Sequence, residues 1–282
     1  MQNLLILPLI MCKENKISIM GIVNLTDDSY YAESRCIDVQ AALDHIGKFV
    51  NEGADIIDIG ACSTRPGALP VGAEEEWRRL EPVLVAFMET FQNVTLSIDT
   101  YWSSVVERVF DIAGPFIVND ITAGAGDPQM LPTVGRLGLK YVAMHMRGAP
   151  ENMQLLTDYN DVVGEVLEYF KEFADKAEKY GIKEWIADPG FGFAKTLEQN
   201  YALLRGLERF KAELRGTNPP SQLLVGISRK SMIYNLLNIN PEDSLPATQA
   251  LHMVALQKGA DVLRVHDVAE ARHTVSLFGM MA

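Results

Sequence analysis

The feature that most constrains this chain is an eightfold alternation between short apolar runs and longer amphipathic stretches. The short runs are rich in isoleucine and valine, as buried parallel strands are, and the longer stretches have apolar residues at helical spacing. The predicted strands are Ile17–Asn24, Asp55–Ile59, Thr95–Ile98, Phe116–Val118, Tyr141–Met144, Trp185–Ala187, Leu223–Val225 and Val262–Arg264. The predicted helices are Val39–Asn51, Glu74–Thr90, Trp102–Asp111, Gln129–Arg136, Asp161–Tyr180, Leu197–Leu214, Lys230–Leu237 and Val268–Phe278, with an additional helix, Ala247–Lys258, before the last strand.

Eight strand–helix units predict an α/β fold, a (β/α)8 TIM barrel, with a doubly wound open sheet as the alternative. The chain has 282 residues, and such barrels have about 250. Because no Gly/Ser-rich or Pro-rich linker divides the chain, we expect one domain over residues 1–282, with residues 1–16 as an N-terminal extension.

Composition narrows the class of protein. The net charge of -12 opposes a nucleic-acid role, which needs a basic surface.

The apolar run Leu4–Met11 is too short to span a bilayer and follows no basic residue. We therefore expect neither a membrane segment nor a signal peptide, and packing under the barrel floor is the simplest role for this run. The three cysteines, Cys12, Cys36 and Cys62, form no CxxC pair, which favours a reducing cytoplasm over a disulfide framework.

Polar residues follow the predicted strands where each strand ends. In a barrel of this kind the carboxyl ends of all strands meet at one mouth, so these side chains should converge although they are scattered in the sequence. They are Asn24, Asp58, Asp99, Asn119, His145, Asp188, Ser228–Ser231 and Arg264–His266.

Two carboxylates and an amide stand out in this set. Asp99 follows the third strand, Asn119 the fourth, and Asp188 begins the segment DPGFGFAK after the sixth. Together such groups can bind the amino-pyrimidinone edge of a pterin, which resembles the edge of guanine. The alternative is capping of the following helix, which is strongest for Asp99 because SIDTYW leads straight into a predicted helix.

Cationic residues occur in three further segments. Arg65 lies in STRPG, Arg229 and Lys230 lie in GISRKS, and Arg264 and His266 alternate onto one face of RVHDV. Guanidinium groups suit phosphate oxygens, and two cations at a helix start oppose the helix dipole, which is typical of a functional site. For Arg65 alone a surface turn is the simpler interpretation, and the segment from Met20 to Tyr31 could be either a capped turn or a loop over the mouth.

These motifs together resemble the dihydropteroate synthase family. The matching segments are MGIVNLT-D-S, GADIIDIG-STRPGA, SIDT, NDI, MHM, DPGFGF, GISRKS and RVHDV, in family order over residues 20 to 268. The resemblance implies a transferase of folate biosynthesis that condenses 7,8-dihydropterin-6-ylmethyl diphosphate with p-aminobenzoate to give 7,8-dihydropteroate and diphosphate. It also implies Mg²⁺ as cofactor, sulfonamides as inhibitors, a cytoplasmic location and a homodimer that forms through late barrel helices, with His252 and Met253 on one candidate face.

The resemblance assigns roles to individual residues. The catalytic group is Lys230, Asp99, Arg264 and His266. The pterin pocket is Asp99, Asn119, Met144, Asp188, Arg229 and Lys230, with the Arg229 guanidinium packed beside the ring. The diphosphate would be held by Asn24, Arg65, Arg264 and His266, with Mg²⁺ bridging Asn24 and phosphate oxygens, and p-aminobenzoate by Thr64, Pro66, Phe193 and Ser231, next to Lys230.

The chain departs from the family pattern in two loops. The usual TPDSFSDGG is TDDSYYAES here, with Asp27 for a proline, Tyr30 at the aromatic position and Ala32 at the later aspartate, so we predict that Glu33 substitutes for that acid. Ala61 and Cys62 replace the usual Gly-Glu before STRPG. Two alternatives remain open: a methyltetrahydrofolate-handling methyltransferase, and a degenerate pterin-binding paralogue without activity.

Overall fold

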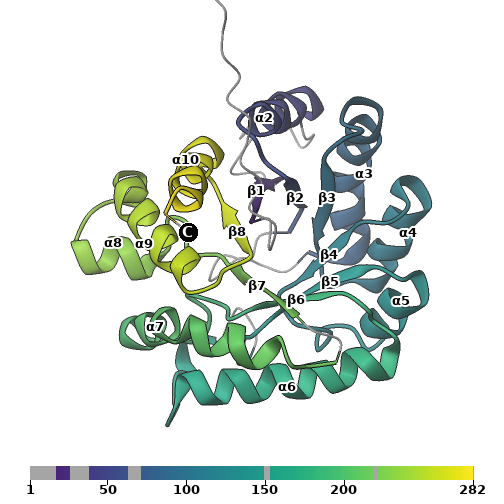
Figure 1. Cartoon of the computed structure of the whole chain (residues 1–282). Helices are drawn as coiled ribbons and strands as arrows, with labels where there is room; N and C mark the ends of the chain where they lie inside the picture. The colour runs from purple at the N-terminus through teal and green to yellow at the C-terminus, as the bar shows by residue number, and fades with distance from the viewer. Residues whose placement is uncertain (1–16, 26–37, 63–70, 149–152, 219–220, 282) are drawn as a thin grey trace, which may run out of the picture.

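The chain forms a closed barrel of parallel strands surrounded by helices. The computed structural model describes residues 17–25, 38–62, 71–148, 153–218 and 221–281. Each strand pairs with the next, and the last pairs with the first, so the barrel has no open edge (Figure 1). The strands are β1 (Ser18–Asn24), β2 (Ile56–Gly60), β3 (Thr95–Asp99), β4 (Ile117–Asp120), β5 (Lys140–Met144), β6 (Trp185–Asp188), β7 (Ser221–Val225) and β8 (Val262–Val265). The predicted barrel is confirmed and the open sheet is excluded.

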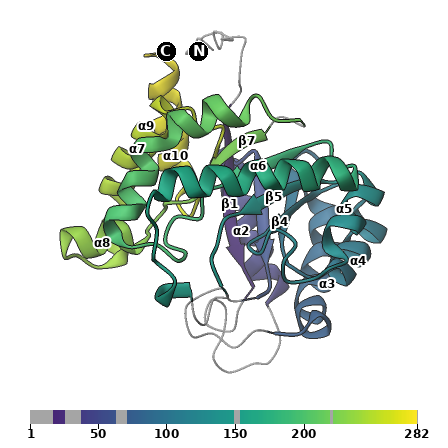
Figure 2. The ribbon, with the colours of Figure 1, turned by 90° about the horizontal axis from the view of Figure 1, so that it is seen from below.

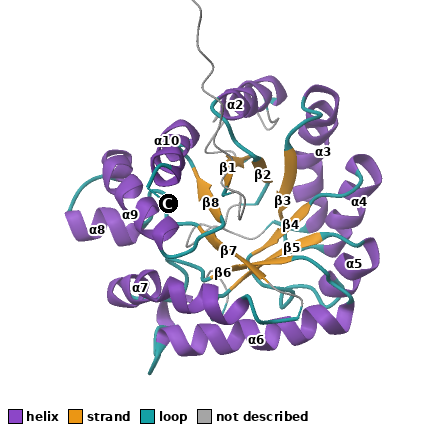
Figure 3. Ribbon diagram, viewed as in Figure 1, coloured by secondary structure: helices purple, strands orange, loops and turns teal. Residues whose placement is uncertain are grey.

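Helices form a ring outside the strands, as Figure 3 shows by colour. They are α2 (Val39–Asn51), α3 (Ala73–Thr90), α4 (Ser103–Ala113), α5 (Met130–Leu137), α6 (Val162–Tyr180), α7 (Leu197–Leu214), α8 (Ser231–Leu237), α9 (Leu245–Gln257) and α10 (Val268–Gly279), with short 3-10 helices η1 (Met153–Leu155) and η2 (Pro241–Ser244). Seen from below, α6 runs along one flank of the barrel (Figure 2). No helix among the described residues is long and apolar enough to cross a membrane.

Local chemistry explains where the two best-predicted helices begin. Asp38 accepts a hydrogen bond from the backbone N–H of Ala41 and so caps α2. Thr196 and Gln199 form a reciprocal capping box at the start of α7. Both helices match the sequence prediction at both ends, because a capped start and an amphipathic body indicate the same boundaries.

The barrel interior contains two layers of different chemistry. A lower layer is apolar, and we call it the floor layer; it consists of Met20, Ile56, Ile117, Val142, Ile186, Leu224 and Val262. Successive side chains of a strand point to opposite faces, so the residue two positions later points inward again. On five of these strands that residue is Asp58, Asn119, Met144, Asp188 or Arg264. These five side chains form what we call the upper layer, which lies toward the carboxyl ends of the strands.

Candidate functional site

An arginine between two aspartates occupies the centre of the upper layer. Arg264, on β8, donates from Nε to Oδ2 of Asp58 at 2.7 Å and from Nη2 to Oδ2 of Asp99 at 3.0 Å. The Asp58 side chain has no solvent exposure, and those of Asp99 and Arg264 are only 12% and 21% exposed. A cation that bonds to two carboxylates is held in a fixed position.

Asp58 accepts two further hydrogen bonds. The Ser97 hydroxyl donates to Oδ1 at 2.6 Å, and the Asn119 amide nitrogen donates to Oδ2 at 2.9 Å. Ser97, Asn119 and Arg264 come from β3, β4 and β8, and all three meet the carboxylate carried by β2. Sequence analysis noted Asp58 at the mouth but assigned it no role.

Asp99 does not cap the following helix. Asp127 takes that position, because its Oδ2 accepts from the backbone N–H and the hydroxyl of Ser103, the first residue of α4. Burial raises the pKa of Asp99 to about 7, against the opposing effect of the Arg264 cation. The capping alternative for Asp99 therefore fails, and its carboxyl group bonds to Arg264 instead.

Asp188 and Lys230 both bond to the loop that follows β6, and the charge of each affects the pKa of the other. The backbone N–H of Gly190 donates to Oδ1 of Asp188 at 2.8 Å, and burial raises the pKa of this carboxyl group. The Lys230 ammonium donates to the carbonyl of Phe191 at 2.8 Å and lies 4.3 Å from the centre of the Phe193 ring. Burial lowers the pKa of Lys230 to about 8, so at neutral pH it is a cation that can readily lose its proton.

A second lysine, Lys195, holds this loop in place. Its buried ammonium donates to the carbonyls of Gly190 at 3.0 Å and Phe193 at 2.9 Å, and lies 3.1 Å from Nδ1 of His145. Burial lowers the pKa of Lys195 to about 7 and that of His145 to about 2, so the imidazole is neutral. Gly190 is required here, because at φ +69° an added Cβ would lie 2.0 Å from the carbonyl oxygen of His145. Sequence analysis gave Lys195 no role. Its place in the apolar segment GFGFAK was the only sign in the sequence that this lysine could be buried.

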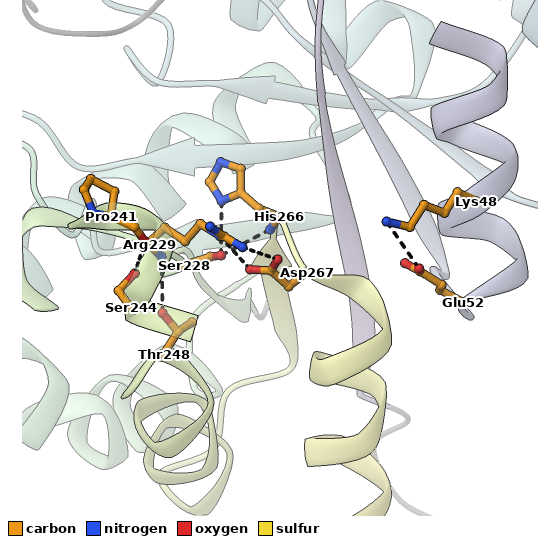
Figure 4. A network of polar contacts seen from close by, with 9 residues as sticks. All are labelled: Lys48, Glu52, Ser228, Arg229, Pro241, Ser244, Thr248, His266 and Asp267. Carbon is orange, nitrogen blue, oxygen red and sulfur yellow. Dashed lines mark hydrogen bonds and ion pairs between the residues drawn. The ribbon is translucent and has the colours of Figure 1, made fainter. Parts of the chain in front are cut away.

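The segment after β7 and the end of β8 form a polar network (Figure 4). The Arg229 guanidinium makes a two-point ion pair with Asp267, at 2.9 Å and 2.7 Å, on a backbone with φ +52°. The Ser228 hydroxyl lies 3.1 Å from Nδ1 of His266 and accepts from its backbone N–H at 3.2 Å. Desolvation and the nearby Arg264 cation lower the pKa of the His266 ring to about 4, although the residue is exposed to solvent. His266 is therefore neutral at pH 7 in the free protein, and packing of Arg229 beside a ligand ring stays a prediction.

The other predicted site residues divide into two groups. Asn24 ends β1, Met144 ends β5, Phe193 contacts Lys230, and Ser231 begins α8. The remaining predicted positions lie outside the described residues; they are Thr64, Arg65, Pro66, Asp27, Tyr30, Ala32 and Glu33.

One buried acid near the mouth was missed altogether. Glu76, in the first turn of α3, has no solvent exposure, and neither of its carboxyl oxygens has a hydrogen-bond partner among the described residues. Burial raises its pKa to about 7, and the nearby Thr100 hydroxyl opposes this shift without reaching hydrogen-bond geometry. Cys62 is also buried, with its sulfur 3.9 Å from the hydroxyl of Tyr101, and burial raises the pKa of its thiol.

The arrangement suits a ligand with a donor-rich ring and an anionic group. Asp99, Asn119 and Asp188 supply hydrogen-bond acceptors for ring N–H and amino groups. Arg264 and Lys230 supply positive charge within the same mouth, against the net charge of -12 of the chain.

Comparisons with known proteins agree with this chemistry. A family model described as pterin binding enzyme matches residues 20–266. The dihydropteroate synthase of Escherichia coli (strain K12) is 41% identical over 254 residues, covering 89% of this chain and 87% of that protein. The Yersinia pestis dihydropteroate synthase, solved with a sulfonamide drug complex, has a TM-score of 0.85 and 34% identity, covering 94% of this chain and 93% of its own. The Xanthomonas albilineans dihydropteroate synthase, solved with 4-aminobenzoic acid, has a TM-score of 0.85 and 36% identity with the same two coverages.

Proposed function

Because the chain belongs to the dihydropteroate synthase family of pterin-binding enzymes, we propose that the mouth of its barrel divides into pterin, diphosphate and p-aminobenzoate sites. The protein is a transferase of folate biosynthesis that joins 7,8-dihydropterin-6-ylmethyl diphosphate to p-aminobenzoate, giving 7,8-dihydropteroate and diphosphate. At 41% identity to a synthase over most of the chain, this activity is better supported than a methyltransferase activity.

The pterin would lie against the upper layer. Asp99, Asn119 and Asp188 offer acceptors to its amino and N–H groups, and Lys230 offers a donor to its carbonyl oxygen. Met144 ends β5 beside Asp188, so it supplies an apolar contact to the ring. Arg229 would contribute only after its ion pair with Asp267 opens or turns toward the ligand.

The diphosphate would be held by Arg264 and His266, together with Asn24 and Arg65. Asn24 offers one amide oxygen at the mouth, and no group of three His, Cys, Asp or Glu side chains among the described residues could hold a metal ion by itself. This donor set fits Mg²⁺, which commonly keeps several waters and binds one or two protein oxygens together with substrate phosphates. When bound, Mg²⁺ would neutralise charge on the departing diphosphate.

The p-aminobenzoate would lie between the loop after β6 and the start of α8. Phe193 gives an aromatic wall, and the N–H of Ser231 can donate to the carboxylate. Thr64 and Pro66 would complete this pocket. Sulfonamides, one of which was solved in complex with the Yersinia pestis relative, would occupy the same place.

The reaction needs stabilisation of charge more than a strong base. The C–O bond between the pterin methylene and the diphosphate breaks, and the leaving group takes the electron pair. The aniline nitrogen forms the new C–N bond and releases a proton. Arg264 stabilises the negative charge on the leaving group, and the Asp99 carboxylate stabilises positive charge developing on the dihydropterin. Lys230 anchors the ring so that its methylene faces the aniline.

The cluster of Asp58, Asp99, Asn119 and Arg264 at the mouth carries this proposal. The test is a turnover assay with dihydropterin-methyl diphosphate, p-aminobenzoate and Mg²⁺. Loss of one charge-assisted contact in Lys230→Ala should lower kcat/KM by roughly 10- to 100-fold, whereas the exposed Lys183→Ala should not. A folded wild type that binds pterin without turnover would instead support the degenerate paralogue.

Two further properties complete the proposal. A homodimer would form through α8 and α10, which expose Leu236, Leu237 and Leu277. His252 cannot contribute an exposed contact, because it is buried within the chain and pairs with Gln249. Light scattering coupled to gel filtration would test the dimer. A cytoplasmic location is supported by the cysteine content of the chain, because its three cysteines form no CxxC pair.

A further inference from the structure

Asp58 is the most completely engaged carboxylate of the upper layer, and the proposed chemistry does not use it directly. It is fully buried, below the face that would meet a ligand. Its Oδ2 accepts from the Asn119 amide at 2.9 Å and from Arg264 at 2.7 Å, while Oδ1 accepts from Ser97 at 2.6 Å. One buried group therefore touches both a predicted pterin-binding residue and a predicted diphosphate-binding residue.

The chemistry of a carboxylate fixes the orientation of the Asn119 amide. An ionised carboxylate only accepts hydrogen bonds, so Asn119 must turn its NH₂ group toward Asp58. A flipped amide would place its carbonyl oxygen against Oδ2, so that two acceptors meet and the Asn119 oxygen has no donor there, which is costly even though Oδ2 keeps its bond from Arg264. The carbonyl oxygen of Asn119 is consequently turned away from Asp58, and it bonds to none of the described residues, so it can face the mouth as an acceptor.

We propose that Asp58 is a positioning residue that sets ring specificity, by locking Asn119 so that the site accepts a ring edge rich in hydrogen-bond donors. This inference rests on the proposed function of the mouth. A 2-aminopyrimidinone offers donors at that edge. The same bicyclic ring with an oxo group in place of the 2-amino group offers a carbonyl oxygen instead, which would meet the Asn119 oxygen without a bond.

The same carboxylate oxygen links ring recognition to diphosphate binding. Arg264 and Asn119 share Oδ2 of Asp58, so a change at this oxygen affects both residues together. The p-aminobenzoate pocket has no described contact with Asp58. Loss of the accepting oxygens should therefore raise KM for the pterin diphosphate more than KM for p-aminobenzoate.

The test compares Asp58→Leu with Asp58→Asn. Leucine has nearly the shape of aspartate but accepts nothing, so the Asn119 amide can adopt either orientation. Asparagine can keep its carbonyl oxygen at the Oδ2 position, while the Ser97 hydroxyl accepts from its amide. The readout is the ratio of affinities for 6-hydroxymethylpterin and its 2-oxo analogue, measured by calorimetry on each purified full-length protein.

We expect the ratio to favour the pterin in the wild type, to fall at least about 10-fold in Asp58→Leu, and to remain mostly unchanged in Asp58→Asn. An unchanged ratio in Asp58→Leu would overturn the inference, as would an equal loss in both variants, because charge rather than the accepting oxygen would then matter. A wild type that does not bind pterin would instead refute the proposed function.

A measurement on the wild type covers the case in which Asp58→Leu does not fold. In ¹⁵N-labelled protein the side-chain NH₂ of Asn119, assigned by its loss in Asn119→Ser, should exchange slowly with solvent in the absence of ligand. Rapid exchange would show that the amide is not held and would overturn the inference.

Discussion

The floor layer and the upper layer of the barrel are built on the same strands, two residues apart, yet one is apolar and the other is polar. The floor layer is uniformly apolar and buried, so its side chains stabilise the barrel by packing and by removal of surface from water. The upper layer buries carboxylates, an amide and a guanidinium group, and these are tolerated because they bond to one another. The comparison teaches that a shift of two residues along a strand separates the part that holds the fold from the part that binds a ligand.

The largest expected effect comes from replacing Arg264, the cation of the upper layer. Arg264→Met would leave Asp58 and Asp99 buried without the cation that bonds to both. Removing one member of a buried ion pair typically costs about 3–5 kcal/mol. We expect a loss of that size in the free energy of unfolding, measured with urea, together with loss of turnover.

An exposed ion pair provides the matched control for Arg264. Arg136 pairs with Glu107 on the surface, where such a pair contributes about 0–1 kcal/mol, so Arg136→Met should unfold almost like the wild type. Equal losses in the two variants would mean that burial of the Arg264 network has no energetic consequence.

Truncation of the floor layer should affect stability without affecting chemistry. Ile186 has no solvent exposure, and Ile186→Ala should cost about 2–4 kcal/mol through lost transfer free energy and a cavity. Because Asp188 lies two residues further along the strand, we expect kcat and both KM values to stay within about twofold. Ile112→Ala, at a site 39% exposed, is the control for stability. A large rise in KM for Ile186→Ala would show that the two layers are not separable.

Glu76 is buried without a hydrogen-bond partner among the described residues, and it predicts a stabilising substitution. Its pKa is about 7 in the folded protein against 4.5 for an ordinary glutamate, so the folded state binds more protons between these pH values. The contribution of Glu76 to stability should therefore fall as pH rises from 4.5 to 7, by about 3 kcal/mol at 1.36 kcal/mol per pH unit. Glu76→Gln should raise the free energy of unfolding by about 1–3 kcal/mol at pH 8 and have little effect at pH 4.5.

The pH dependence separates this effect from a general effect of charge. Glu81 is an exposed residue of the same helix, and Glu81→Gln should change stability little at either pH. A Glu76→Gln variant that is no more stable than the wild type at pH 8 would mean that its carboxylate has a favourable partner.

The sequence predicted the barrel well, because the spacing of apolar residues and the length of each segment indicate strands and helices locally. Each predicted strand corresponds to an observed one, and α2 and α7 match at both ends. The role of Asp58 could not be predicted from the sequence, because its hydrogen-bond partners lie 39, 61 and 206 residues away along the chain. Glu76 follows Glu74 and Glu75 in an amphipathic helix, and composition alone does not say which of the three turns inward. The individual assignments of ligand-binding residues stay predictions, although the described ones lie at the carboxyl ends of the strands or in the loops that follow them.

The smallest expected effect concerns His266, which follows the end of β8 two residues after Arg264 of the upper layer. Its pKa of about 4 makes it neutral at pH 7, so it offers a hydrogen bond rather than a charge. A diphosphate bound beside it would favour the charged ring and raise that pKa, so binding should take up a fraction of a proton and tighten as pH falls from 8 to 6. We expect a gain in affinity of at most about threefold, which His266→Gln removes while leaving the protonation of the diphosphate itself unchanged. Calorimetry in buffers of different ionisation enthalpy measures the proton uptake directly. Equal uptake in the wild type and in His266→Gln would mean that the ring stays neutral and that Arg264, bound between two carboxylates, is the cation that meets the leaving group.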